Sequence, residues 1–235
     1  MAISISETAD RRDIKRWWLI IALGMSVLFW RVLLPTYTDI TVRTVILVAV
    51  LDLILTATVV LLARKELKEA SARKFRGRDF LKALLLYVIA MAITMLYARL
   101  IVIDGIPLYE SMANAPAQWV ATEYRRIFPL GIFLSTVVAA PVWEEIVFRM
   151  TGKKLFRNPV LFVAVTSCLF AFIHTVNFSL ADNLDYFLFG VIMAVSYLIV
   201  KDIRIMMLVH LLWNGMAYVL RPLSEYLLSV YTGLA

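Results

Sequence analysis

Apolar segments long enough to cross a bilayer follow one another through most of this chain, and this feature limits its fold more than any other. A helix of about 20 apolar residues spans the hydrocarbon of a membrane. Seven spans are predicted, each with ends defined to within several residues: 17–34, 42–63, 80–103, 127–156, 158–178, 184–200 and 203–221. The tail, 222–235, suits either a short eighth helix or a segment lying at the membrane interface.

The composition excludes an ordinary water-soluble domain. The 235 residues are 62% hydrophobic and 17% charged, whereas soluble domains are about 45–50% apolar and about 25% charged. Within lipid every backbone polar group needs a partner inside the chain, which favours helices. We therefore predict an all-α, polytopic transmembrane bundle of seven to eight helices, forming a single domain over residues 1–235.

The ends of the chain and its one cysteine add two expectations. The polar lead-in before the first span has no small-residue cleavage site after it, so we expect a retained anchor and not a signal peptide. Cys168, the only cysteine, lies inside an apolar run, which excludes a disulfide framework.

Basic residues predict the topology. The net charge is +7, but most of the 24 lysines and arginines lie between alternate spans, which argues for cytoplasmic loops and against nucleic acid as a partner. The richest of these loops joins the second and third spans, so the amino terminus is predicted to be cytoplasmic. We expect this loop to contact anionic lipid headgroups. The opposite loop, 104–126, carries aromatic residues that suit an interfacial segment.

Seven polar residues inside the apolar spans are informative, because a charge at the bilayer centre costs at least ~2.5–3.5 kcal/mol and therefore needs a partner or a function. They are Asp52, Glu144, Glu145, Arg149, His174, His210 and Asn214. For Asp52 three alternatives stay open: a structural ion pair with Arg31 or Arg43, which the residues favour, a place in the lining of a polar cavity, or a part in substrate entry.

Helical spacing distinguishes the roles of the two adjacent glutamates, Glu144 and Glu145. Residues four apart share a face of a helix, so Glu145 and Arg149 are predicted to form an ion pair. Glu144 points about 100° away, and its own fourth neighbour is Phe148, which cannot satisfy a carboxylate. Glu144 is therefore the candidate for reaction.

The only two histidines of the chain both fall inside spans. His174 follows Phe170 by one turn, and His210 shares a face with Asn214. A single buried histidine is usually structural, but two beside a matched asparagine and a glutamate suggest a site. At 1.5 Å per residue, Glu144, His174 and His210 lie about 14–24 Å from the same membrane face, which is compatible with one mid-membrane cluster.

This set of side chains suits hydrolysis. A buried glutamate can take a proton from water and return it to a leaving amine, while a histidine holds the water. The second histidine and the asparagine can donate hydrogen bonds to the developing oxyanion. A serine nucleophile elbow and an HExxH motif are both absent from the sequence.

Three segments, EEIVFR (144–149), FAFIH (170–174) and HLLWN (210–214), resemble the E-E-x-x-x-R, F-x-x-x-H and H-x-x-x-N motifs of the CAAX-protease and bacteriocin-processing family. The likeness covers residues 140–216. It implies a bacterial, multi-pass intramembrane endopeptidase with its active site inside the membrane. By this resemblance Glu144 activates water with His174, His210 and Asn214 form the oxyanion site, and Glu145, Arg149 and Phe170 support them. Met150 departs from the family, where glycine is common.

The resemblance leaves several alternatives. No cofactor is expected, although Glu144, His174 and His210 would be the ligands of a zinc-dependent version. The substrate is a peptide or protein: a prenylated CAAX tail, a bacteriocin or a signalling peptide. A non-catalytic immunity protein that binds a peptide is the rival from another class. A transporter would have internal symmetry or paired broken helices, and the sequence has neither.

Overall fold

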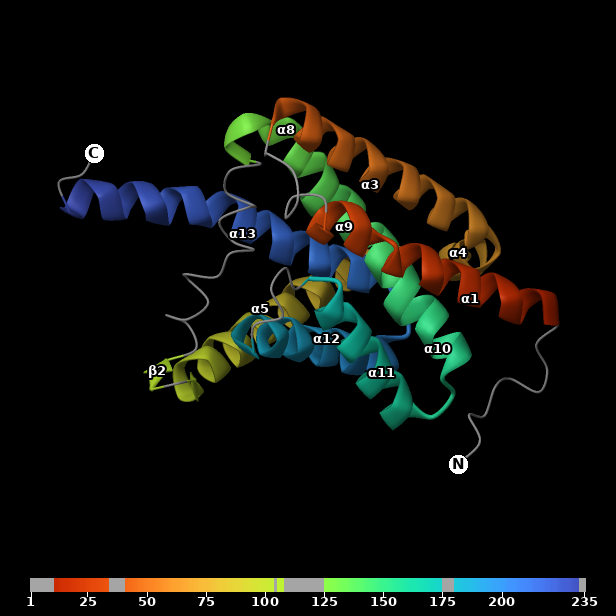
Figure 1. The fold of residues 1–235 in the computed structure, drawn as a ribbon. Coiled ribbons are helices and arrows are strands. Elements are labelled where there is room, and N and C mark those ends of the chain that lie inside the picture. Colours follow the sequence, from red (N-terminus) through yellow and green to blue (C-terminus); the bar gives the residue numbers. More distant parts are fainter. Residues whose placement is uncertain (1–10, 34–40, 104, 108–124, 175–179, 233–235) are drawn as a thin grey trace.

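The computed structural model describes residues 11–33, 41–103, 105–107, 125–174 and 180–232. This part of the chain is an all-α bundle, as predicted, with one two-residue β ladder (Figure 1). In chain order the elements are α1 (Arg11–Met25), η1 (Leu28–Leu33), α3 (Val42–Leu62), α4 (Arg64–Ser71), α5 (Gly77–Leu100), β1 (Val102–Ile103), β2 (Ile106–Pro107), α8 (Pro129–Ile132), η2 (Phe133–Ala139), α9 (Ala140–Glu144), η3 (Glu145–Thr151), α10 (Gly152–Leu155), α11 (Pro159–Phe172), α12 (Leu180–Val200) and α13 (Ile203–Thr232).

Four helices are long and apolar enough to cross a membrane: Val42–Leu62, Gly77–Leu100, Pro129–Leu155 and Asn183–Val200. Two further apolar helices, Pro159–Phe172 and Ile203–Val219, are shorter. All six coincide with predicted spans. The first predicted span, 17–34, instead contains the end of α1 and the π-helix η1. Because α13 continues without a break to Thr232, most of the tail extends the last helix and does not form a separate eighth one.

The helix Pro129–Leu155 is the centre of the bundle, between α1 and α3 on one side and α11, α12 and α13 on the other (Figure 1). Of its most apolar window 67% is buried, against 17% for α5, which leaves most of its apolar surface exposed. Two stretches of this helix, η2 and η3, are π-helical. π-Helical turns are rare, and inside α-helices they are frequently found at functional sites.

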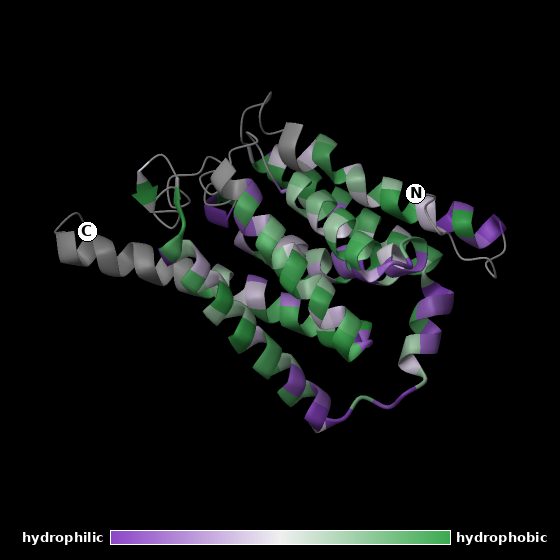
Figure 2. Cartoon of the chain, turned by 90° about the horizontal axis from the view of Figure 1, so that it is seen from below, coloured by the Kyte–Doolittle hydropathy of each residue, from purple (hydrophilic) through white to green (hydrophobic). Residues whose placement is uncertain are grey.

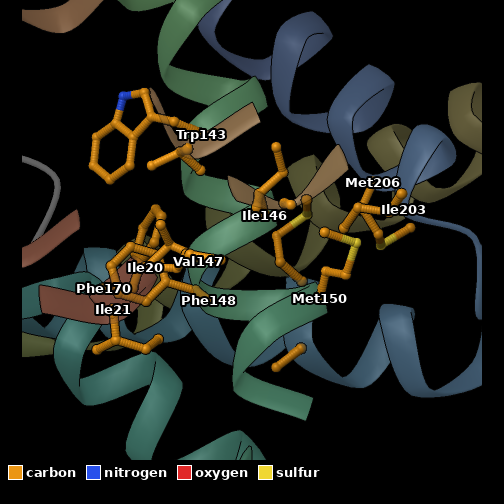
Figure 3. Packing of buried hydrophobic residues seen from close by; sticks show 14 of the residues in the cluster. Ile20, Ile21, Trp143, Ile146, Val147, Phe148, Met150, Phe170, Ile203 and Met206 are labelled. Carbon is orange, nitrogen blue, oxygen red and sulfur yellow. The ribbon is translucent and has the colours of Figure 1, made fainter. Parts of the chain in front are cut away.

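The apolar core surrounds this central helix. In Figure 3, Ile20 and Ile21 of α1 lie near Val147 and Phe148, with Phe170 of α11 close by. Methionines and isoleucines of α13 pack against the other face. The close approach of α1 depends on Gly24, because a Cβ there would lie 2.8 Å from Cγ1 of Val147. Apolar burial of this kind fixes the direction in which the polar residues of the central helix point.

Hydrophilic residues collect at the ends of the helices, whereas the sides are apolar (Figure 2). Several of the segments predicted to share one membrane face are in contact. Arg73, which precedes α5, donates to Asp79 and to Asp202, which lies between α12 and α13. Arg204 donates to Asp202 and to the carbonyl of Arg73. The contacts agree with the grouping of these loops, while the side on which they lie stays a prediction.

Asp202 is the most tightly held carboxylate of this polar cluster. Burial raises the pKa of Asp202, but hydrogen bonds from Arg204 and Arg73 outweigh burial, and the pKa falls to about 2. A similar contact joins α1 to α4, where Nη2 of Arg16 lies 2.5 Å from Oε1 of Glu66.

Only the edges of the loop 104–126 are described. Val102 pairs with Pro107 and Ile103 with Ile106 in an antiparallel ladder, and Gly105 in the turn has φ = 80°, which favours glycine. The expectation of an interfacial segment concerns residues 108–124, which lie outside the described part of the chain.

Candidate active site

The polar residues of three separate helices meet at one cavity of about 310 Å³. The central helix supplies Glu144, α11 leads into His174, and α13 supplies His210 and Asn214. Phe170 also lines the cavity. All four residues predicted as catalytic therefore face the same space, although they come from positions up to 70 residues apart in the sequence.

Glu144 lies between the two histidines. Its Oε2 is 3.7 Å from Nε2 of His174 and 3.7 Å from Nε2 of His210. Glu144 is only 1% exposed. Both distances exceed that of a direct hydrogen bond, and one bridging water would connect the carboxylate to the two imidazoles for proton transfer.

The other ring nitrogen of each histidine has a partner that fixes the tautomer. Nδ1 of His174 lies 2.7 Å from the carbonyl oxygen of Phe170, which can only accept, so Nδ1 carries the hydrogen. Nδ1 of His210 lies 2.9 Å from Oε1 of Glu145 and donates to that carboxylate. In its neutral form each histidine therefore directs the lone pair of Nε2 toward Glu144, whereas a doubly protonated ring donates from Nε2. A water molecule or an added proton between these atoms would relieve their repulsion.

Glu145 and Arg149 form the predicted ion pair, with Nε of Arg149 3.5 Å from Oε2 of Glu145 and both side chains fully buried. Glu145 also accepts from His210, a contact that the spacing of the first motif did not predict. Both glutamates thus reach one histidine, although adjacent residues of an α-helix diverge by about 100°. The π-turn that begins at Glu145 alters the regular spacing of side chains at this point.

Phe170 is in contact with several members of the cluster. Its ring centroid is 4.4 Å from that of His174 and 5.9 Å from that of His210. The guanidinium carbon of Arg149 lies 5.1 Å from the same ring, in a cation–π contact. The second motif therefore supports Arg149 as well as His174.

Asn214 is anchored to the central helix. Its Nδ2 donates to the carbonyl oxygen of Thr136 at 2.7 Å. That carbonyl lacks its usual donors, because the N–H of Ala140 bonds to Ser135 and Pro141, five residues on, has no N–H. Pro141 thus leaves the Thr136 carbonyl of η2 able to accept a hydrogen bond from Asn214, and this bond holds Asn214 at the cavity.

Asp52 has a structural environment outside the cavity. Its carboxylate accepts hydrogen bonds from Nε1 of Trp30 at 3.0 Å and from the hydroxyl of Ser135 on the central helix. Asp52 is fully buried. It therefore joins α3 to η1 and η2, which favours the structural alternative; the side chain of Arg31 lies outside the described part of the chain.

Sequence reasoning missed an aromatic wall beside the histidines. Tyr186 of α12 stacks on His174, with centroids 4.4 Å apart and an interplanar angle of 23°. Phe189 lies 5.1 Å from His210 and 4.6 Å from Trp213. The signal available was weak: Trp213 stands three residues after His210, but nothing in the spacing of α12 marks Tyr186 and Phe189 as cavity residues.

Residues 126–216, which contain all three motifs, match the family model described as type II CAAX prenyl endopeptidase Rce1-like. The chain is 31% identical over 94 residues to the UPF0177 protein YvdC of Lactococcus lactis subsp. lactis (strain IL1403), covering 39% of this chain and 36% of that protein. It is 39% identical over 49 residues to the UPF0177 protein YaiH of the same strain, or 21% of each chain. The matched part thus spans about a third of the length of YvdC and about a fifth of the length of YaiH.

A longer match is more distant in sequence. The chain is 22% identical over 201 residues to the membrane-embedded CAAX protease MroQ of Staphylococcus aureus (strain USA300), covering 81% of this chain and 79% of that protein. No solved structure matches the chain.

Proposed function

The chain is a member of the CAAX-protease and bacteriocin-processing family, and on this premise we propose that it is an intramembrane endopeptidase in which Glu144 activates water. The observation that carries the proposal is the position of one Glu144 oxygen 3.7 Å from each of two histidine nitrogens at the edge of a cavity. A positioned acid–base group of this kind contributes about 10²–10⁴-fold to hydrolysis.

The reaction begins with water held between Glu144 and His174. Glu144 takes one proton as the water oxygen attacks the carbonyl carbon of the peptide bond. The same proton then passes to the amide nitrogen, the C–N bond breaks, and the products are a new carboxylic acid, which ionises, and a new amine, which takes up that proton. His174 accepts a hydrogen bond from the water through Nε2, because its Nδ1–H is engaged by the carbonyl of Phe170.

His210 and Asn214 stabilise the oxyanion of the tetrahedral intermediate. Since Nδ1–H of His210 donates to Glu145, a second donation from Nε2 requires the doubly protonated ring. The Glu145 carboxylate stabilises that imidazolium, as a buried carboxylate does in other hydrolytic sites. Asn214 donates one N–H of its amide to the Thr136 carbonyl, and its second N–H is available to donate to the oxyanion.

A zinc-dependent version of the same protease is the alternative within this class. Its ligands would be His174, His210 and Glu144, and the metal would supply Lewis-acid activation of water. Among the described residues, no three His, Cys, Asp or Glu side chains are arranged to hold a metal ion. The steps described above use side chains alone, and chelation tests this choice: activity that disappears with a chelator and returns with zinc would support the metal version.

The substrate is proposed to be a peptide at the membrane, such as a CAAX-type tail, a bacteriocin or a signalling peptide. The cavity wall formed by Phe189, Trp213 and Tyr186 suits apolar side chains near the cleaved bond. The rival function, binding of a peptide without hydrolysis, requires the aromatic wall but not the proton-transfer geometry at Glu144.

One experiment separates the two functions. The purified protein in liposomes is incubated with N-terminally acylated peptides of one length and randomised sequence, and fragments are identified by mass spectrometry. We expect fragments with the parent protein and with Glu69→Gln, an exposed carboxylate far from the site in sequence, and none with Glu144→Gln. If all three proteins retain the peptides equally and none produces a fragment, the function is peptide binding and not hydrolysis.

A further inference from the structure

A second hollow lies between α11 and α12, at the surface of the bundle. Its volume is about 410 Å³, and every residue that lines it is apolar. Four of the lining residues come from α11, between Pro159 and Ala164, and three come from α12: Phe187, Val191 and Leu198. None of them lines the cavity that contains the proposed catalytic residues. The hollow, which we call the lateral groove, is therefore a separate feature of the molecule.

The lateral groove is open on the side that faces away from the core, where Val160 is 76% exposed. Adjacent residues of α12 face the two spaces, because neighbours on a helix diverge by about 100°. Tyr186 lines the cavity at Glu144, and Phe187 lines the groove. Since α12 is one of the helices that cross the membrane, the groove opens to hydrocarbon, and an apolar chain is suited to fill it.

The packing of α11 against α12 determines which residues lie at each end of the groove. The two helices are joined by a short connection and run antiparallel, side by side (Figure 1). Ser167 lies opposite Gly190, where a Cβ would be 3.0 Å from the Ser167 Cα. Eight residues from this point, in the opposite sense on each helix, Pro159 stands opposite Leu198. These two residues therefore mark one end of the groove.

Basic residues collect at this end. Arg157 precedes Pro159 by two residues, Lys201 follows Leu198 by three, and both basic side chains are exposed. Nζ of Lys153 donates to the carbonyl oxygen of Arg157 at 2.7 Å, which adds a third positive charge.

The local charge at this end is positive. The segment 152–160 holds three basic residues and no acidic one. Asp202, which follows Lys201, accepts hydrogen bonds from Arg73 and Arg204. Exposed arginine and lysine side chains at a membrane surface are suited to bind the phosphate of a lipid headgroup.

The length of the groove matches one leaflet of the membrane. Phe187 and Leu198, which line it, are eleven residues apart, or about 16 Å along α12 at 1.5 Å per residue. The hydrocarbon core is about 30 Å thick, so one leaflet contributes about 15 Å. An acyl chain that starts at the basic end therefore follows the whole groove and ends near Phe187.

We propose that the lateral groove binds one acyl chain of an anionic phospholipid, with the lipid phosphate bound by Arg157 and Lys201. The basic loops that lie on this face are predicted to be cytoplasmic, and the cytoplasmic leaflet carries the negative surface charge that such a lipid supplies. The bound lipid stabilises the pair of helices that brings Tyr186 to His174. Lipid binding here is independent of hydrolysis by Glu144, so each can be tested without the other.

Native mass spectrometry in a neutral detergent tests lipid binding directly. The purified protein is titrated with phosphatidylglycerol and, separately, with phosphatidylcholine that has the same acyl chains. Each basic residue near a membrane surface should raise the affinity for an anionic lipid about fivefold, so we expect one phosphatidylglycerol bound about 10- to 30-fold more tightly than phosphatidylcholine. Glycerol phosphate, which has the charge without the chains, should not displace it.

Two variants test the headgroup contact. Arg157→Gln and Lys201→Gln should each lower the affinity for phosphatidylglycerol about fivefold and leave the affinity for phosphatidylcholine unchanged. Lys68→Gln is the matched control, because Lys68 is an exposed basic residue of α4 on the same predicted membrane face and does not adjoin the groove residues in sequence. An equal loss of affinity in Lys68→Gln would mean that the lipid responds to the charge of the whole surface, which contradicts a site at Arg157 and Lys201.

Two further variants test the contact with the acyl chain. Ala164→Phe fills the groove and should abolish retention of phosphatidylglycerol. Val160→Trp fills it from a mostly exposed position and should do the same. Ala57→Phe, at an exposed position of α3 that does not line the groove, should have no effect. The midpoint of thermal unfolding without lipid shows whether each variant is folded.

Equal affinity of the parent for the two phospholipids would overturn the proposal, and so would unchanged binding in folded Ala164→Phe and Val160→Trp. Displacement of the bound lipid by an N-terminally acylated peptide would assign the groove to a substrate chain and would also overturn it. None of these results bears on hydrolysis, which is measured with Glu144→Gln.

Discussion

Nδ1 of His210 lies 2.9 Å from Oε1 of Glu145, and this buried hydrogen bond joins the third sequence motif to the first. Glu145 also pairs with Arg149, which contacts the ring of Phe170 in the second motif. The residues proposed to support catalysis therefore form a continuous layer behind Glu144 and His210. In this layer Glu145 determines which nitrogen of His210 faces the cavity.

Glu145→Gln tests this relationship. The amide keeps the volume of the side chain and can still accept from Nδ1, but it lacks the charge that stabilises the His210 imidazolium and that pairs with the buried Arg149. We expect kcat to fall by about 10²–10⁴-fold with little change in KM, because the lost interaction acts on the transition state. The variant is compared with Glu69→Gln by steady-state kinetics in liposomes, after folding is checked by circular dichroism. An unchanged kcat would contradict the role given to Glu145.

The buried pair of Glu145 and Arg149 predicts non-additive losses. Glu145→Ala or Arg149→Ala leaves an unpaired charge in the interior, which costs about 3–5 kcal/mol. The double variant removes both charges and should lose less stability than the sum of the two single variants. The midpoints of thermal unfolding in detergent measure this coupling. Additive losses would mean that the contact of 3.5 Å carries no interaction energy.

Asn214 is predicted to act on the rate more than on the fold. Asn214→Ala removes one proposed oxyanion donor and should lower kcat about 10²–10³-fold. It also leaves the Thr136 carbonyl without its donor, a loss of about 1–3 kcal/mol if no water replaces it. Ser26→Ala, a polar truncation outside the cavity, serves as the control for folding. A variant with normal kcat and reduced stability would restrict Asn214 to a structural role.

The polar cluster at Asp202 predicts a dependence of stability on acid. The folded-state pKa of Asp202, about 2, lies below the ordinary value of about 3.9. Its stabilisation is therefore complete above pH ~4 and is lost as the pH falls toward ~2. Asp202→Asn should lower the unfolding midpoint at pH 7, and between pH 5 and pH 3 the difference from the parent should shrink. A difference that stays constant with pH would show that Asp202 does not act through its charge.

The sequence was sufficient to predict six of the seven expected spans, all except 17–34, and the grouping of the site residues around one cavity. Apolar runs and buried polar groups carry large free energies, so the spans of α3 and α5 and the convergence of Glu144, His174 and His210 follow from them. The pairing of Glu145 with Arg149 followed from helical spacing alone. These features depend on local pattern and on the exclusion of charge from lipid.

Other features depend on contacts between helices, and the sequence offered no comparable signal. The π-turn after Glu144, which brings both glutamates to His210, changes the register of an otherwise ordinary helical pattern. The hydrogen bond from Asn214 to Thr136 could be predicted only by knowing which backbone carbonyl Pro141 leaves without a donor. Tyr186 reaches His174 because of the way α12 packs against α11, and its position follows from packing and not from spacing.

The central claim, that Glu144 supplies the base for peptide hydrolysis, is tested most directly by kcat of purified Glu144→Gln on a peptide that the parent cleaves. Glutamine keeps the size of the side chain and cannot take the proton from water, so substrate binding should be unchanged while kcat falls by at least about 10²–10⁴-fold. His174→Ala and His210→Ala should be similarly impaired. A Glu144→Gln protein that cleaves the peptide as fast as the parent would contradict the account.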